Sequence, residues 1–258
     1  MRVDREIAVS LRGVNRSFGG NVAVRDLDLE IERGSIHGLL GPNGSGKSTT
    51  MKMVMGLLKS DSGEIDVYGK DPRRDPLGVK RMVGYVPETS RLYEYLTGLE
   101  YLDFVADVYG VEPDVKEERI HEFLEAFGLE GRENEMISGY SHGMKQKTAL
   151  IGALLHRPRL LILDEPLGGL DPKSARIVKD ILLRLSGEGV TTIFSTHIME
   201  IADVLCDRIS VLYEGEKIGE GSPEELRGMA GSGSTLEEVF LLLTGADDVA
   251  EIVDALMG

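Results

Sequence analysis

The sequence predicts an α/β fold in which a mainly parallel sheet alternates with helices, an antiparallel β subdomain precedes it, and an α-helical subdomain is inserted into it. Three observations support this class. Residues 5–40 alternate strand-like runs with turn signals, which is typical of short sheets. Residues 92–155 carry mostly helical patterns and no convincing strand. Residues 159–215 alternate strand-type runs with helical segments, the arrangement that builds a parallel sheet.

The composition is that of a folded globular protein and argues against nucleic-acid binding. The 258 residues are 41% hydrophobic and 28% charged, which is ample to bury a sizeable core. The formal net charge is −15, and no basic patch is segregated in the sequence. Because the summed field repels phosphate backbones, no nucleic-acid partner is expected.

Cysteine usage and the apolar runs indicate a compartment. Cys206 is the only cysteine, which excludes an intrachain disulfide and fits a reducing environment. We expect it to be a small buried hydrophobe. The first ten residues carry acids and no apolar stretch of signal-peptide length, and no segment reaches the roughly 18 apolar residues of a membrane span. The simplest expectation is a cytoplasmic chain.

The first elements are three strands and a helix. Strand-like runs cover residues 7–15 and 22–31 around the turn "FGGN", and a short apolar strand follows at 36–40. Residues 47–59 have helical periodicity after a glycine-rich loop. One apolar face of this helix is formed by Met51, Val54, Met55 and Leu58.

The later elements define the domains. Two further strands at 63–69 and 81–88 precede the inserted helical subdomain, which we place at about 89–156. The main domain extends over residues 1–230, and the glycine-rich joint "GMAGSGST" leads to a helical tail at 231–258. The predicted parallel strands are 159–166, 190–196 and 208–215, with helices at 172–185 and 198–205 between them.

A phosphate-binding loop follows the third predicted strand. The segment "GPNGSGKST" fits the pattern G-x-x-x-x-G-K-[ST] between a strand and a helix, as the mechanism requires. Glycines let backbone N–H groups face the phosphates, and the helix N-terminus adds partial positive charge. Lys47 is expected to reach the β- and γ-phosphates and Ser48 to hold Mg²⁺. This predicts a P-loop NTPase (RecA-like) core whose ATP-binding residues are Gly41, Pro42, Asn43, Gly44, Ser45, Gly46, Lys47, Ser48 and Thr49.

Two acids follow a buried strand in "LLILDEP". Asp164 leaves the strand at its carboxyl end, where open α/β sheets bind their ligands, and is expected to bind Mg²⁺. Glu165 projects differently and is expected to orient or deprotonate the attacking water.

Further patterns stand in order along the chain: "SFGG", "GYVPE", "YSHGMKQK", "GGLDP" and "FSTHIME". With them the chain resembles the nucleotide-binding subunit of an ABC transporter over nearly its whole length. The resemblance places Phe18 as the adenine-stacking aromatic and Glu88 at the Q-loop glutamine. It places Asp171 at the aspartate of the D-loop at the dimer interface, and His197 at the switch histidine that contacts the γ-phosphate. The signature sequence falls on Ser141, His142, Gly143 and Met144.

The signature stretch forms the start of an apolar helix, and its polar residues are best explained by contact with a second copy of the chain. Ser141 is a good N-cap, and Met144, Ile151 and Leu155 can bury one side of the helix. The exposed amino end is then an anion site. The resemblance implies that this end meets the γ-phosphate bound by the other subunit of a head-to-tail dimer.

Two residues depart from the family pattern. His142 stands where the family prefers glycine, and its imidazole either crowds the interface or adds a contact to the partner's nucleotide. Glu88 replaces the Q-loop carboxamide, and a carboxylate still suits a hard metal such as Mg²⁺.

The resemblance also implies partners and a location. An ATPase subunit of this kind binds ATP and Mg²⁺, pairs with itself or a homologous ATPase subunit, and powers a separate transmembrane permease from the inner face of the cell membrane. The segments "VPETSRLYEYLTGLEYL" and "LEEVFLLLTG" look most like the exporter branch, which moves drugs, lipids, polysaccharides or antibiotics. Two alternatives remain open: a soluble ABC-family ATPase that acts on ribosomes or DNA, and a nucleotide-binding regulator of low activity.

Overall fold

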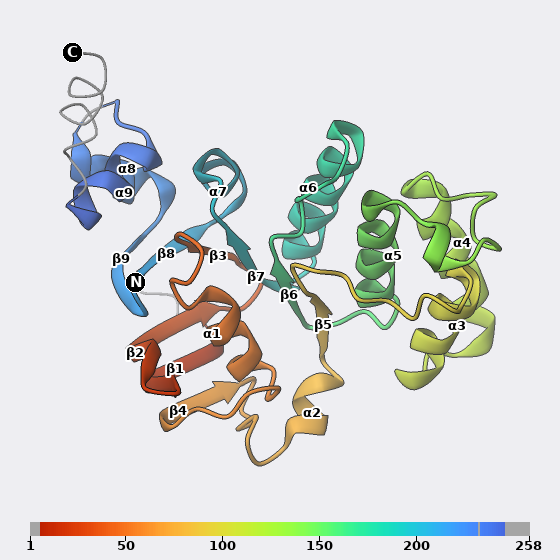
Figure 1. Cartoon of the computed structure of the whole chain (residues 1–258), viewed down its shortest axis with the longest axis horizontal. Coiled ribbons are helices and arrows are strands. Elements are labelled where there is room, and N and C mark those ends of the chain that lie inside the picture. The colour runs from red at the N-terminus through yellow and green to blue at the C-terminus, as the bar shows by residue number, and fades with distance from the viewer. Residues whose placement is uncertain (1–5, 232, 246–258) are drawn as a thin grey trace.

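The N-terminal sheet is antiparallel, as the alternating strands predict. The computed structural model describes residues 6–231 and 233–245, and Figure 1 shows this sheet at one end of the molecule. The central strand β1 pairs with β2 on one side and β4 on the other. The strands are β1 (Ile7–Phe18), β2 (Asn21–Glu32) and β4 (Ser62–Val67).

The main sheet has six strands in the order β5-β6-β7-β3-β8-β9. Its first five strands run parallel, and β9 pairs antiparallel with β8 at the edge, outside the predicted elements. All residues of β3, β6 and β7 are buried, because helices cover both faces of a parallel sheet. The strands are β3 (Ile36–Leu40), β5 (Val83–Val86), β6 (Leu160–Asp164), β7 (Thr191–Thr196), β8 (Arg208–Tyr213) and β9 (Glu216–Gly221).

The two faces of the main sheet lie in different hydrophobic clusters. Leu39 joins the cluster that α1 (Lys47–Val54) shares with the N-terminal sheet, whereas Leu40 points to the opposite cluster with α6 (Pro172–Gly187) and α7 (Met199–Leu205). The strand β3 therefore sits in the middle of the core and fixes the place where its following loop emerges.

The helix after the phosphate loop is shorter than predicted. Periodicity favoured a helix to residue 59, but α1 ends at Val54. Gly56 adopts φ +65, and its N–H bonds the carbonyl of Met53, which closes the helix. A Cβ at this glycine would lie 2.6 Å from the carbonyl oxygen of Pro72. Tertiary contact with a later loop therefore terminates a helix that the apolar pattern would continue.

The predicted helical insertion stands beyond β5 at the opposite end of the molecule from the N-terminal sheet (Figure 1). Within it the structure describes an isolated bridge between Thr97 and Met136 and no strand. A capping box between Thr97 and Glu100 begins α3. The preceding short helix is α2 (Pro76–Lys80), and the insertion contains α3 (Gly98–Val108), α4 (Pro113–Ala126), the 3₁₀ helix η1 (Ile137–Gly139) and α5 (His142–Leu154).

The C-terminal helices pack on the core. A helix not predicted from the sequence, α8 (Pro223–Ala230), occupies the first residues of the expected joint, and α9 (Leu236–Thr244) confirms the predicted apolar helix. Leu236 and Val239 of α9 are buried in the same cluster as α7. The rest of the predicted helical tail, residues 246–258, lies outside the described residues. Among the residues that the structure describes, no helix combines the length and apolar character needed to cross a membrane.

Candidate active site

The loop between β3 and α1 has the backbone that a phosphate cradle requires. Gly46 adopts φ +104 as the N-cap of α1, and a Cβ there would stand 2.6 Å from the carbonyl oxygen of Ala23. A Cβ at Gly41 would stand 2.2 Å from the carbonyl oxygen of Leu212. Glycine is therefore needed at both positions, because no side chain fits between the loop and the strands beside it.

Lys47 lies at the bottom of this loop with only 5% of its surface exposed. Its ammonium donates to the carbonyl oxygens of Gly41 at 2.7 Å and Pro42 at 3.1 Å. Burial lowers the pKa of Lys47, while the nearby carboxylates Glu165 and Asp164 oppose that shift. A buried cation held by neutral carbonyls is well suited to an anionic ligand that brings charge to it.

Two carboxylates occupy the carboxyl end of β6. Asp164 is 3% exposed and accepts a 2.6 Å hydrogen bond from the hydroxyl of Ser195 on the neighbouring strand β7. Glu165 adopts φ +50, a rare conformation for a residue with a side chain, and its N–H donates to Ser195 Oγ at 3.0 Å. Its Oε1 lies 2.9 Å from Nδ1 of His197. The chain thus turns sharply after Asp164 and sends the two acids in different directions.

A cavity of about 490 Å³ unites most of the predicted nucleotide site. Phe18 stands at its rim with 45% of its surface exposed, and the guanidinium of Arg16 lies 4.5 Å from the ring centroid. Glu88 is exposed at the end of β5 and also lines the cavity. The lining residues are Phe18, Ala23, Asn43, Gly44, Ser45, Gly46, Lys47, Ser48, Thr49, Glu88, Asp164 and Glu165.

Three residues predicted for the ATP site of this subunit, Gly41, Pro42 and His197, stand outside the lining. Gly41 and Pro42 support the cavity from behind, since their carbonyls hold Lys47. His197 reaches the site through Glu165. Ser45 Oγ is buried without a hydrogen-bond partner, so an oxygen-rich ligand in the cradle would satisfy it.

The donor set also fits Mg²⁺. In the described part of the chain, no three His, Cys, Asp or Glu side chains gather as a metal cage. Mg²⁺ does not need one, because it is usually held by one or two carboxylates together with phosphate oxygens and waters. Ser48, Glu88 and Asp164 line one cavity beside the phosphate cradle, which is the arrangement that such an ion uses.

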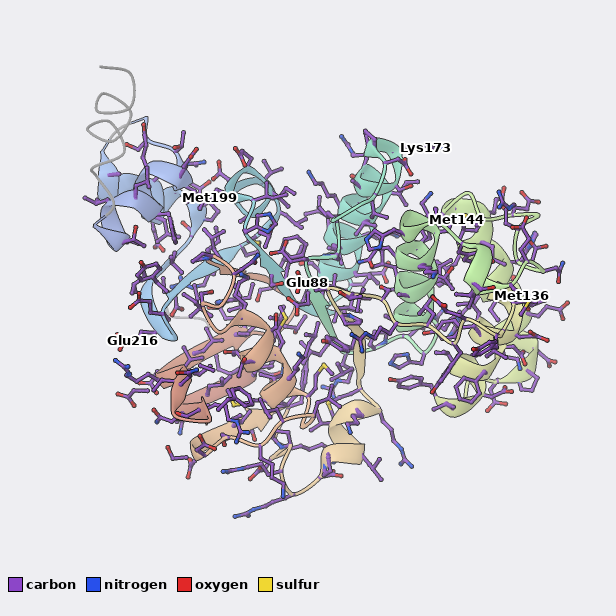
Figure 2. All side chains as sticks on the ribbon, viewed as in Figure 1. Glu88, Met136, Met144, Lys173, Met199 and Glu216 are labelled. Carbon is purple, nitrogen blue, oxygen red and sulfur yellow. The ribbon has the colours of Figure 1, made fainter. Side chains whose placement is uncertain are left out.

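The signature segment stands apart from this cavity. Ser141 caps α5 by accepting a 3.2 Å hydrogen bond from the N–H of Met144. None of the four signature residues lines the cavity, and Figure 2 shows Met144 on α5 away from Glu88. The predicted anchors Ile151 and Leu155 are fully buried. The N-terminal end of α5, which we call the tip, is therefore a capped and exposed helix end outside the nucleotide site of its own subunit.

His142, which departs from the family pattern, packs against its own chain. Its imidazole fills the space beside Gly169, where an added Cβ would meet His142 Cδ2 at 2.3 Å. A Cβ at Gly143 would lie 3.2 Å from the carbonyl oxygen of Gly169. The signature helix is thus seated on the segment that follows the two carboxylates.

Asp171 ends that same segment. It caps α6 by accepting from the N–H and hydroxyl of Ser174 at 2.9 and 2.6 Å. These bonds, with Lys147 at 3.2 Å, lower the pKa of Asp171. The carboxylate predicted at a dimer interface is therefore about half exposed and charged.

Two polar residues of the site were missed from the sequence. Ser195 holds both Asp164 and Glu165, and Gln146 is a buried polar residue of α5. The short segment "FST" ahead of His197 could have indicated Ser195, because a polar residue on a buried strand needs a partner. For Gln146 the only signal was a glutamine between two lysines on an apolar helix.

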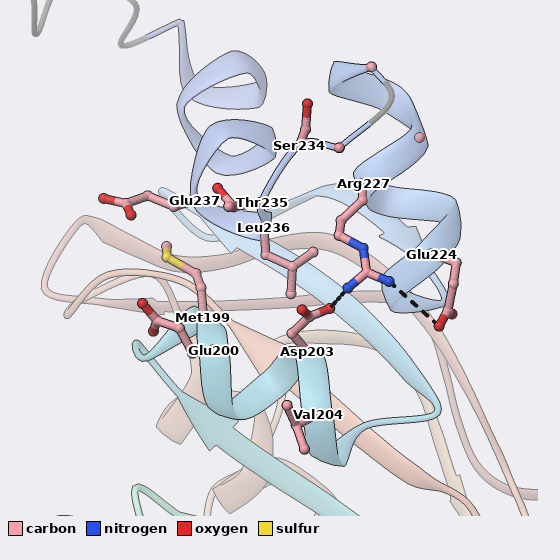
Figure 3. A pocket seen from close by; sticks show the side chains of 13 residues that line it. Met199, Glu200, Asp203, Val204, Glu224, Arg227, Ser234, Thr235, Leu236 and Glu237 are labelled. Atoms are coloured by element: carbon pink, nitrogen blue, oxygen red, sulfur yellow. Dashed lines mark hydrogen bonds and ion pairs between the residues drawn. The ribbon is translucent and has the colours of Figure 1, made fainter.

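A second hollow, of about 630 Å³, lies between α7, α8 and α9 (Figure 3). Arg227 crosses it to pair with Asp203 and Glu224. It contains none of the predicted site residues, and its arginine is already paired with two carboxylates.

Three features place the chain in the class of P-loop nucleotide-hydrolysing proteins: a buried lysine in a glycine loop, two carboxylates at the end of a neighbouring strand, and a parallel sheet. Comparison with known proteins gives the family. A family model described as "ABC transporter" matches residues 24–168. The linearmycin resistance ATP-binding protein LnrL of Bacillus subtilis is 36% identical over 224 residues, or 87% of this chain and 72% of that protein. The chain therefore belongs to the ABC transporter family and is an ATP-binding, ATP-hydrolysing subunit.

Solved structures agree with this assignment. The chain is similar to an "ATP binding subunit of ABC transporter" with a TM-score of 0.87 and 32% identity, over 92% of this chain and 99% of that one. It is also similar to the ATP-binding cassette MJ0796, solved as a dimer in a post-hydrolysis state with ADP and Pi. The TM-score there is 0.76 at 26% identity, over 83% of this chain and 98% of that one. The predicted fold class is confirmed.

Proposed function

We propose that two ATPase subunits of this kind, two copies of this chain or this chain and a homologue, pair head to tail and hydrolyse ATP at sites shared between them. The observation that carries the proposal is the tip of α5: Ser141 caps an exposed helix end that lies outside the cavity of its own subunit. A helix N-terminus favours anions, so a phosphate from another subunit is a fitting partner. The similar cassette MJ0796, which was solved as a dimer with ADP and Pi, supports the pairing of two subunits.

Within one subunit, the groups around the cavity have complementary roles. The ammonium of Lys47 exchanges its loop carbonyls for the β- and γ-phosphates. Ser48, Asp164 and Glu88 are the groups that would hold Mg²⁺, which neutralises developing phosphate charge when bound. Phe18 stacks on the base.

Glu165 is the proposed general base. Ser195 fixes the backbone of Glu165, and the imidazole of His197 lies 2.9 Å from its carboxylate. A carboxylate held in this way can accept the proton of the attacking water, while His197 remains close enough to reach the γ-phosphate. Asp171 and the signature residues Ser141, His142, Gly143 and Met144 serve the site of the other subunit.

A separate membrane permease is the proposed partner. A groove of about 320 Å³ between the core and the helical subdomain is lined by Tyr85, Tyr101 and Tyr109. Close to it, Tyr93 and Tyr95 are 62% and 91% exposed. Aromatic side chains with this exposure are enriched at protein interfaces. The chain would then work at the inner face of the cell membrane.

Export is the proposed direction of transport. LnrL is named for resistance to linearmycin. Removal of a toxic compound from the cell is the direction of transport that confers resistance. The cargo class proposed for the permease is accordingly a drug, lipid, polysaccharide or antibiotic.

Sedimentation of the Glu165→Gln protein tests the shared sites. With the base removed, Mg-ATP should convert the protein from monomer to dimer, while Mg-ADP should not, because the γ-phosphate bridges the subunits. Steady-state turnover should fall by about 10² to 10⁴. A protein that stays monomeric with Mg-ATP, even beside the permease, would contradict the proposal.

A further inference from the structure

Gln146 is a buried polar residue of α5 with both ends of its side chain bonded. It is 1% exposed, although it stands between two lysines in the sequence. Its Oε1 accepts a 2.6 Å hydrogen bond from the hydroxyl of Ser90, and its Nε2 donates to the carbonyl oxygen of Pro166 at 3.3 Å. A carbonyl can only accept, so the orientation of the amide is fixed by chemistry.

The two partners of Gln146 belong to the two loops that carry the carboxylates of the active site. Ser90 lies two residues after Glu88, and Pro166 directly follows Glu165. The helix that carries Gln146 begins one turn earlier at the tip capped by Ser141. One buried side chain therefore joins both sides of the subunit's own ATP cavity to the tip that serves the other subunit.

Other contacts seat α5 on the same segment but cannot replace this one. Lys147 reaches Asp171 at 3.2 Å, yet that carboxylate is 53% exposed, and an exposed ion pair contributes little. His142 packs beside Gly169 through its imidazole ring. Among these contacts of α5 in the described part of the chain, only the hydrogen bonds of Gln146 are fully buried. Loss of a partner there leaves buried polar atoms unsatisfied.

We propose that Gln146 is a positioning residue that holds the signature tip in register with the Glu88 and Glu165 loops. Nucleotide in one subunit then sets the orientation of the tip that this subunit presents to its partner. The inference rests on the proposed head-to-tail function and goes beyond it, because it assigns the link between the two half-sites to one amide. It does not make Gln146 a catalytic residue, since the amide lines no part of the cavity.

Dimerisation of the Glu165→Gln protein with Mg-ATP gives the test. Gln146→Met keeps the volume and loses both hydrogen bonds, so the dimer dissociation constant measured by sedimentation should rise about tenfold. ATP affinity of the dilute monomer, measured by fluorescence titration, should stay within about twofold, because no cavity residue changes. Thr148→Val is the matched control: it is equally buried on α5, but its hydroxyl bonds only Met144 within the helix.

The outcomes separate the inference from the function on which it rests. Equal dimerisation with glutamine and methionine at position 146 would overturn the inference alone. A Glu165→Gln protein that never dimerises would contradict the shared sites and the inference together. An equal loss in Thr148→Val would show that any buried change in α5 has the same effect, and would also overturn it.

Ser90→Ala gives a second, milder variant in case Gln146→Met folds poorly. It removes the bond to the Glu88 loop and leaves the helix unchanged. If the amide acts as a link, Ser90→Ala and Gln146→Met weaken the same contact, so the double variant should dimerise better than the sum of the two single effects implies. Additive effects would overturn the inference.

Discussion

The phosphate loop and the tip of α5 are both helix N-termini, but the chain treats them differently. At α1, Lys47 is buried and two carboxylates converge on it from β6. At α5, Ser141 is exposed and caps the helix, and it lines no part of the cavity of its own subunit. One terminus is completed by its own subunit, and under the proposed function the other meets a phosphate bound by a second subunit.

The cradle and the tip of α5 should control different properties of the protein. A complete cradle can bind ATP in a single subunit, whereas an incomplete terminus can act only when a second subunit brings phosphate to it. Changes in the cradle should therefore alter ATP affinity, and changes at the tip should alter turnover with affinity unchanged.

Ser141→Asp should have the largest effect on turnover. Aspartate caps a helix as well as serine and favours its positive end, so α5 should stay folded. Its charge would repel a phosphate from the other subunit. By analogy with an arginine finger, loss of the group supplied in trans lowers the rate by about 10³. ATP hydrolysis and monomer affinity are the two measurements.

Ser222→Asp controls for the capping change itself. Ser222 is the N-cap of α8, its side chain accepts from the N–H three residues later as that of Ser141 does, and it does not line the cavity. Its substitution should leave hydrolysis within about twofold of the parent. If Ser141→Asp hydrolyses ATP as fast as Ser222→Asp, the tip does not serve a phosphate.

Lys47→Met should have the next largest effect, on binding. It removes the buried cation that faces the phosphates, and a charge-assisted hydrogen bond of about 3 kcal/mol corresponds to about 10² in ATP affinity. Lys52→Met is the matched control, because Lys52 is exposed on the same helix. Calorimetric titration with ATP should separate the two variants, and equal affinities would remove Lys47 from the cradle.

Mixing these two inactive variants tests whether the cradle and the tip of one site come from different subunits. In a head-to-tail pair of Ser141→Asp and Lys47→Met, one shared site carries both defects and the other carries neither. Turnover should therefore return on mixing, to at most about half of the parent rate, since each mixed dimer has one intact site. Mixtures that stay as inactive as their components would indicate that cradle and tip belong to the same subunit.

The sequence predicted the cradle well because its determinants are local. Consecutive residues 41–49 carry the glycines, the lysine and the hydroxyls, and the strand before them is apolar. The capped tip at Ser141 was equally local. The family resemblance supplied the remaining residues in the right order, and the structure gathers Phe18, Glu88 and Asp164 around one cavity.

The features that the sequence did not predict depend on distant contacts. Helix α1 ends at Val54, ahead of Gly56, which packs closely against the carbonyl oxygen of Pro72. The periodicity of the helix itself does not reveal this contact. Ser195 matters because β7 pairs with β6, and Gln146 matters because two loops meet behind α5. Strand β9 lacks an apolar run, because it is an edge strand that is mostly half-buried.

Acid should weaken the core through a buried neutral histidine. His37 of β3 is 1% exposed, and its Nε2 lies 3.0 Å from Ser210 Oγ. Burial lowers the pKa of His37 to about 4, from about 6.5 when unfolded. The unfolded chain binds the extra proton between these values, so the free energy of unfolding falls as pH drops from about 6.5 to 4, by about 2 to 3 kcal/mol.

His37→Gln tests this pH dependence, since its amide can still bond Ser210. Between pH 7 and pH 5, the free energy of unfolding measured in urea should fall less for this variant than for the parent. His121→Gln, on an exposed site of α4, should behave as the parent. His156 should keep part of the acid sensitivity in both variants. Its pKa is also lowered by burial to about 4, so the helical subdomain retains an acid-sensitive group in every variant.

Phe18→Ala should have the smallest effect and the most informative one. The ring lines the cavity, and Arg16, fixed by an ion pair with Asp61, lies over it. If the ring stacks on the base as proposed, loss of a contact of about 1 kcal/mol should raise the KM for ATP about fivefold, while kcat should stay unchanged because such a ring would touch no reacting phosphate. Phe18→Tyr should restore the KM. A fall in kcat without a rise in KM would place Phe18 with the tip and erase the distinction between the two helix ends.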